Sequence, residues 1–75
     1  MKNPKAIKNF GTHFRKFRES KNLSQQKLAD MANINKGTIR TIENGLNGVS
    51  IDVLISIAIA LEVPFTDIVD FKIEK

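Results

Sequence analysis

Residues 23–45 read LSQQKLADMANINKGTIRTIENG and contain two short helical patterns separated by a tight turn. Ser24 is a favourable N-cap, and the apolar residues that follow it recur at helical spacing until Asn33. Asparagine tolerates a left-handed backbone conformation, so Asn33 suits a turn. Asn35 offers a second N-cap, and Gly45 stands where a helix commonly ends. The stretch therefore predicts two capped helices joined by a short turn.

The second predicted helix has two different faces. On a helical wheel, Ile39 and Ile42 fall together on the side that would face a core. The opposite side has no acidic residue and consists of Gly37, Arg40, Thr41 and Asn44, with Lys36 at its N-terminal edge. Guanidinium, ammonium, hydroxyl and amide groups are those that contact DNA bases and phosphates. Glu43 falls beside the apolar side, where an unpaired carboxylate is costly, so it requires a basic partner.

This pattern resembles the lambda repressor-like, or Xre/Cro, helix-turn-helix family, which includes phage repressors and restriction-modification controllers. The likeness covers roughly residues 7–69. Within it, the stretch FGTHFRKFR at residues 10–18 is similar to the family's first helix, and residues 50–63 are similar to its fourth. The resemblance implies that Arg18 pairs with Glu43, which supplies the required basic partner.

The chain departs from the family pattern at three positions. Asn33 stands where glycine is usual, which the turn tolerates, and Lys27 stands where an acidic residue is usual, so no capping box closes. Gly37 occupies a position that often holds a base-reading side chain. Recognition at Gly37 must therefore use the backbone.

The resemblance implies that the helix after Asn35 enters the major groove of double-stranded DNA. The residues expected to read bases are Lys36, Gly37, Thr38, Arg40 and Thr41. The residues expected to hold phosphates are Ser24, Gln25, Gln26, Asn44 and Asn47. Arg18 and Glu43 are expected to form a structural ion pair.

The expected fold is all-α, a compact five-helix bundle whose second and third helices form the helix-turn-helix. Residues 1–5 are expected to be a flexible basic arm, residues 6–71 the DNA-binding domain and residues 72–75 a short C-terminal tail. The apolar residues that the first helix would bury are Ile7, Phe10, Phe14 and Phe17. His13 is expected on an exposed face of that helix, with no evident partner.

The C-terminal third predicts two more helices. Ser50 would cap a fourth helix that Pro64 ends, and residues 65–71 would form a short fifth helix. Residues 51–61 are apolar on almost every side, whereas an outer helix of a lone bundle should have one apolar stripe. We expect a homodimer whose interface consists of Ile55, Ile59, Val63, Phe65 and Val69. The alternative is a central helix wholly buried in its own domain.

Composition and charge fit a small DNA-binding domain. A length of 75 residues allows one domain with a modest core. Residues 1–22 carry seven basic and one acidic side chain, residues 23–48 three and two, and residues 49–75 two and five, so the segment charges are +6, +1 and −3. The basic N-terminal part is expected to face phosphate. With no cysteine, one histidine and no long apolar run, we expect a cytoplasmic protein with no metal, no other cofactor and no membrane partner.

These patterns favour a sequence-specific transcriptional regulator that acts as a homodimer on a palindromic operator. A second function remains open, namely an antitoxin-type DNA-binding protein whose acidic, apolar C-terminal part also binds a small toxin protein. An enzyme is not expected, because no nucleophile, base and orienting residue occur at workable spacing.

Overall fold

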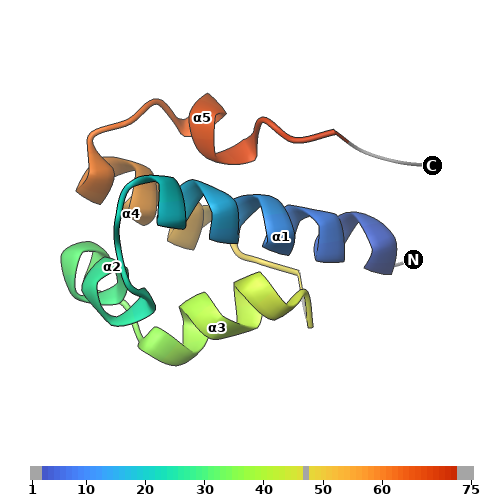
Figure 1. Cartoon of the computed structure of the whole chain (residues 1–75), viewed down its shortest axis with the longest axis horizontal. Helices are drawn as coiled ribbons and strands as arrows, with labels where there is room; N and C mark the ends of the chain where they lie inside the picture. The colour runs from blue at the N-terminus through green and yellow to red at the C-terminus, as the bar shows by residue number, and fades with distance from the viewer. Residues whose placement is uncertain (1–2, 47, 73–75) are drawn as a thin grey trace.

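The computed structural model describes residues 3–46 and 48–72. It contains five α-helices and, within the described residues, no β-strand (Figure 1). The helices are α1 (Pro4–Ser20), α2 (Gln25–Ala32), α3 (Lys36–Asn44), α4 (Ile51–Leu61) and α5 (Phe65–Val69). The predicted all-α, five-helix architecture is therefore confirmed.

The ends of the central helices follow from local hydrogen bonds. Ser24, Asn35 and Ser50 cap α2, α3 and α4, and each side-chain oxygen accepts a backbone N–H, at 3.0, 2.6 and 3.2 Å respectively. Asn33 ends α2 and Gly45 ends α3, both in the left-handed conformation, with φ of 56° and 64°. The predicted caps and turn of the helix-turn-helix are confirmed.

Helix α1 begins at Pro4, within the stretch of residues 1–5 that was expected to be a flexible arm. Pro4 is its first residue, where the fixed φ of proline suits a helix and its missing N–H is not needed. The backbone carbonyl of Asn3 accepts the first helical hydrogen bond, from the amide of Ile7 at 3.0 Å. Pro4 and Lys5 are thus helical, so the expectation of a flexible arm is wrong at these two positions.

Helices α4 and α5 end earlier than expected. Helix α4 stops at Leu61, because Glu62 adopts a left-handed conformation with φ of 55°. The Glu62 amide donates to the carbonyl of Ile59 at 3.2 Å, and the Val63 amide donates to that of Ala58 at 3.1 Å. Proline at position 64 also disfavours helix in the residue before it. Helix α5 ends at residue 69 rather than 71.

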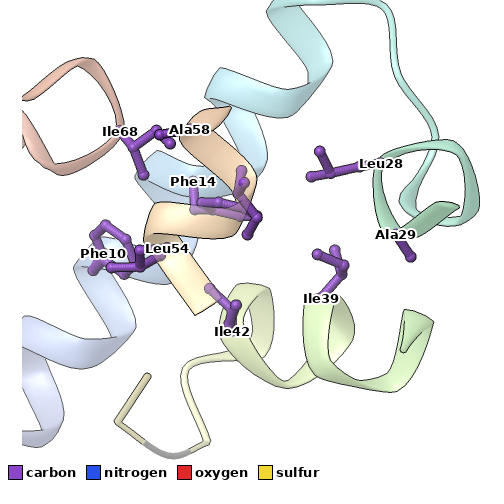
Figure 2. Close-up of a cluster of buried hydrophobic side chains, with 10 residues drawn as sticks. Phe10, Phe14, Leu28, Ala29, Ile39, Ile42, Leu54, Ala58 and Ile68 are labelled. Carbon is purple, nitrogen blue, oxygen red and sulfur yellow. The ribbon is translucent and has the colours of Figure 1, made fainter. Parts of the chain in front are cut away.

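Side chains from all five helices meet in one apolar core (Figure 2). Of the four apolar residues expected to be buried in α1, Phe10 and Phe14 are buried, whereas Ile7 and Phe17 are half-buried at its edge. The buried apolar side chains are Phe10, Phe14, Leu28, Ala29, Ile39, Ile42, Leu54, Ile57, Ala58 and Ile68. Helix α1 runs between α3 on one side and α5 on the other (Figure 1).

His13 is not the solvated, partnerless side chain that its place on α1 suggested. It is half-buried, and its Nε2 lies 2.9 Å from the carbonyl oxygen of Ile68, so Nε2–H donates to that oxygen. The ring also stacks on Phe71, with centroids 5.9 Å apart, and lies 6.2 Å from the ring of Phe10. The expectation was wrong because the chain around α5 returns across α1, a contact that a helical wheel of α1 cannot reveal.

Glycine allows α1 and α3 to approach each other closely. A Cβ at Gly11 would lie 2.5 Å from the carbonyl oxygen of Ile42 and 2.8 Å from that of Glu43. Gly45 makes the reciprocal contact, since a Cβ there would lie 2.6 Å from the Cα of Lys8. Backbone atoms rather than flexible side chains form these contacts, so they could not move aside for a Cβ. The two helices can lie this close together because Gly11 and Gly45 have no Cβ.

We expect Gly11→Ala to destabilise the domain by about 1–3 kcal/mol, the range for an overpacked site. In an unobstructed helix the same change would stabilise the protein by about 1 kcal/mol. The steric clash therefore determines that the free energy of unfolding falls rather than rises. Urea denaturation measures the free energy of unfolding. Gly48→Ala is the matched control, because a Cβ at Gly48 has nothing within 4 Å and should leave the midpoint unchanged. A Gly11→Ala variant as stable as the parent would contradict the close packing of α1 and α3.

Candidate nucleic-acid interface

Helix α3 lies at one edge of the molecule (Figure 1), and the exposed side chains along it are polar. Its inner side is anchored by Ile39, which is completely buried, and Ile42, which is 4% exposed. Lys36, Arg40 and Asn44 are exposed on the outer side. A guanidinium, an ammonium and an amide are thus held on a helix whose position is fixed by its own core contacts.

The other three expected base-reading residues are half-buried. Gly37, Thr38 and Thr41 line a surface groove of about 460 Å³ that separates α3 from the start of α4. The lining residues within the described part of the chain are Asn35, Gly37, Thr38, Thr41, Ile42, Gly48, Val49, Ser50 and Val53. Thr38 and Thr41 therefore border this groove from the α3 side.

The residues expected to hold phosphates differ in their surroundings. Ser24, Gln26 and Asn44 are exposed, and the Nε2 of Gln26 donates to Asp30 at 2.8 Å. Gln25 is half-buried, and its Nε2 donates to Oε1 of Glu43 at 3.2 Å. Asn47 lies outside the described residues. The structure thus brings Gln25 into the ion-pair network, a role that its position as the first residue of α2 did not indicate.

Arg18 and Glu43 form the pair that the sequence required. The Nε of Arg18 donates to Oε2 of Glu43 at 2.7 Å, and Nη2 donates to Oε1 at 3.0 Å. The third nitrogen, Nη1, donates to the carbonyl of Leu23 at 2.6 Å. Arg18 is 8% exposed and Glu43 9% exposed, so this bidentate pair is shielded from solvent.

The pair raises the pKa of Arg18 above its ordinary value. The hydrogen bonds to Glu43 are the main cause, and they outweigh the opposing effect of burial. A raised pKa means that folding favours the charged guanidinium. The stabilisation is present below the ordinary arginine pKa and is lost only as the pH rises through the raised value, in strongly alkaline solution.

This network joins three segments of the chain. Arg18 is near the end of α1, Leu23 precedes α2, and Glu43 is near the end of α3, while Gln25 opens α2. Among the described residues, no buried side-chain nitrogen or oxygen lacks a hydrogen-bond partner. The two helices of the helix-turn-helix are therefore held in a defined relation to each other and to α1.

Helix α4 is neither wholly buried nor evenly exposed. Leu54, Ile57 and Ala58 enter the core, whereas Ile55 is 43% exposed and Ile59 is 72% exposed. Ile51, at 65% exposure, extends the same side of the helix at a spacing of four residues. We call Ile51, Ile55 and Ile59 the isoleucine stripe. The alternative of a wholly buried helix is wrong.

The remaining expected interface residues are less accessible than the isoleucine stripe. Val63, Phe65 and Val69 are half-buried and pack against the core of their own chain.

Two other features bear on the kind of site. Among the described residues, no group of three or more side chains could hold a metal ion. No helix in the described part of the chain is long and apolar enough to span a membrane.

A helix-turn-helix family model matches residues 14–68, which is more than half of the chain. This chain belongs to that helix-turn-helix family. It is the lambda repressor-like family that residues 23–45 resemble, a family of DNA-binding transcriptional regulators rather than enzymes. No curated protein matches the chain significantly.

Two solved structures of regulators share the fold. The restriction-modification controller protein C.AhdI from Aeromonas hydrophila is 25% identical, and the match covers 91% of this chain and 99% of that one, with a TM-score of 0.82. The clp gene regulator ClgR from C. glutamicum is 27% identical, and the match covers 89% of this chain and 87% of that one, with a TM-score of 0.75. The predicted family is confirmed by these comparisons.

We expect Glu43→Ala to destabilise the domain by about 3–5 kcal/mol, because it leaves the buried guanidinium of Arg18 without its counter-charge. Chemical denaturation followed by circular dichroism measures this loss. The matched control is Glu19→Ala, which breaks the exposed Arg15–Glu19 pair at 3.4 Å. That control should cost at most about 1 kcal/mol. Equal small losses in both variants would contradict a buried pair.

Proposed function

We propose that this protein is a sequence-specific regulator that reads double-stranded DNA by placing α3 in the major groove. The observation that carries the proposal is the outer face of α3, which has no acidic side chain and lies at the edge of the molecule. Lys36, Arg40 and Thr41 would contact base edges, Gly37 would contribute its backbone, and Thr38 would act from the groove beside them.

Phosphate contacts would come from the elements that flank α3. Ser24, Gln26 and Asn44 have exposed side chains, and we include Asn47, which follows α3 in the sequence. The first amides of α2 point out of a helix N-terminus, which favours anions. Gln25 would hold a phosphate through its backbone amide, since its side-chain amide donates to Glu43. Apart from Arg18, which is buried against Glu43, the basic residues of the first 22 add a sequence-independent attraction to DNA.

The exposed isoleucine stripe supports a homodimer. Two copies would bury Ile55 and Ile59 against each other about a two-fold axis, with Val63, Phe65 and Val69 at the margin of the contact. Symmetry would place two recognition helices about 34 Å apart, one turn of DNA, and would match a palindromic operator. Both similar structures are of regulators, one of them a restriction-modification controller, which fits this mode of action.

A second occupant of the stripe gives the alternative function. An antitoxin-type protein would use the same apolar side of α4, together with the acidic C-terminal part, to bind a small toxin protein. In that case the isolated chain would be a monomer in solution. The natural complex would then contain a second, different polypeptide that co-purifies with this one.

Arg40→Ala should separate base reading from phosphate binding. We expect a loss of about 1–3 kcal/mol on the preferred operator, together with relaxed preference at one base pair. Selection of bound sequences from random DNA, followed by fluorescence anisotropy titrations, measures both quantities. Gln26→Ala is the control and should weaken binding to all sequences alike. If the parent protein binds selected and random DNA equally well, the proposal of sequence-specific recognition is wrong.

Ile59→Lys tests the homodimer. We expect a folded monomer with weakened operator binding, because a charge cannot be buried in the symmetric contact without a partner. Light scattering gives the mass, and circular dichroism shows whether the chain is folded. Leu46→Lys is the matched control, since Leu46 is 69% exposed but lies outside α4, and it should leave the dimer intact. An intact Ile59→Lys dimer would contradict this interface, and a monomeric parent protein would favour the alternative function.

A further inference from the structure

A second pocket, of about 430 Å³, lies between α1 and the chain that follows α5. Its lining residues within the described part of the chain are Asn9, Thr12, His13 and Lys16 from α1, and Asp70, Phe71 and Lys72 from the other wall. On a wheel of about 100° per residue, the α1 positions form one stripe roughly opposite Gly11, which contacts α3. The chain after α5 runs along one side of α1, and α3 lies on the other side (Figure 1). This pocket is therefore separate from the surface proposed to contact DNA.

Contacts within the chain hold the two walls of this pocket together. The Nε2–H of His13 donates to the carbonyl of Ile68 at 2.9 Å. The ring of Phe71 stacks on that of His13, with centroids 5.9 Å apart, and lies 5.2 Å from the ring of Phe10. Since His13 and Phe71 also line the pocket, its shape is a fixed feature of the fold. Its volume falls within the range of small-molecule sites, about 300–1,000 Å³.

The pocket brings together charges from distant parts of the sequence. Lys16 and Lys72 are exposed, and within the described residues neither forms an ion pair. Asp70 lines the same pocket and is also exposed and unpaired there. These three side chains together carry one net positive charge. The lining thus offers two ammonium groups to an anion and one carboxylate to a hydrogen-bond donor.

We propose that this pocket binds a small sugar phosphate. A phosphate monoester carries about −1.5 to −2 charges at pH 7 and has three strong acceptor oxygens. Lys16 and Lys72 would bind the phosphate from the two walls, since lysine commonly binds phosphate as a point charge. Asp70 and the side-chain amide of Asn9 would bind the hydroxyl groups of the sugar. The volume leaves room for the sugar beside the phosphate.

The carboxylate of Asp70 favours a small ligand over a second segment of DNA. A DNA backbone presents one phosphate after another, and a carboxylate within the contact would repel it. A molecule with a single phosphate and several hydroxyl groups uses both kinds of charge in the lining. The ligand therefore differs in class from the double-stranded DNA proposed for α3.

Nuclear magnetic resonance of the ¹⁵N-labelled full chain tests the site directly, because amide shifts locate even weak binding. We expect ribose 5-phosphate to shift the amides of residues 9–16 and 70–72, with half-saturation near about 1 mM for a ligand of this size. Inorganic phosphate and ribose are the matched probes. Each supplies only part of the contacts, so each should need a concentration about fivefold higher or more at these amides.

Protein variants assign the effect to the charged side chains. Lys16→Gln and Lys72→Gln should each weaken binding of ribose 5-phosphate about fivefold, the effect of one unit charge at about 4 Å in water. Asp70→Asn should reduce the preference for ribose 5-phosphate over inorganic phosphate. Lys27→Gln is the matched control, because Lys27 is exposed on α2 and outside the pocket lining, and it should leave binding unchanged.

Three results would overturn the proposal. The first is a response to ribose 5-phosphate that is absent from residues 9–16 and 70–72, including one confined to the start of α2. The second is equal binding of ribose 5-phosphate and inorganic phosphate, which would show that the sugar is not recognised. The third is a short DNA duplex whose affinity falls in Lys16→Gln and Lys72→Gln while ribose 5-phosphate binding does not, which would make this surface a DNA contact.

Discussion

The buried pairing of Arg18 with Glu43 is the interaction on which the position of α3 depends. Replacement of such a pair by well-packed apolar residues is often neutral or stabilising, so the contribution of the pair to net stability is not its main consequence. Its geometry is directional, however. Two parallel hydrogen bonds, at 2.7 and 3.0 Å, fix the guanidinium against the carboxylate, and a third, to the carbonyl of Leu23, ties both helices to the chain that enters α2.

Close packing of α1 on α3 makes this geometry possible. Gly11 and Gly45 remove the Cβ atoms that would hold the helices apart, and Gly11 contacts the carbonyl of Glu43 itself. The steric and electrostatic constraints therefore act on the same turn of α3. A small shift between the helices would lengthen two charge-assisted hydrogen bonds and leave two charges incompletely solvated, which is costly away from water. If the residues of α3 lay in a mobile loop, no comparable interactions would restrain their position relative to α1.

The sequence predicted what local interactions determine. The caps at Ser24 and Asn35 and the turn at Asn33 involve contacts within a few residues, so the helix-turn-helix could be located without tertiary information. Family resemblance and the cost of an unpaired Glu43 together identified Arg18 as its partner. Other contacts between distant segments were missed. The hydrogen bond from His13 to the carbonyl of Ile68 spans 55 residues and depends on the path of the chain around α5. The end of α4 was misplaced because Glu62 adopts a left-handed conformation that L-residues other than asparagine rarely adopt.

Helix α4 links the two proposed surfaces. On a wheel of about 100° per residue, the isoleucine stripe lies roughly opposite Val53, which lines the groove beside α3. One side of this 11-residue helix would therefore face a partner chain while the other borders the DNA-reading edge. Leu54, Ile57 and Ala58 hold the helix in the core between these two sides. Because protein cores are close-packed and transmit strain, the distance between the two copies of α3 would be set by rigid contacts from the dimer axis through α4, α2 and the shared core to α3. The spacing of the two operator half-sites would then depend on packing in the core as much as on the dimer interface.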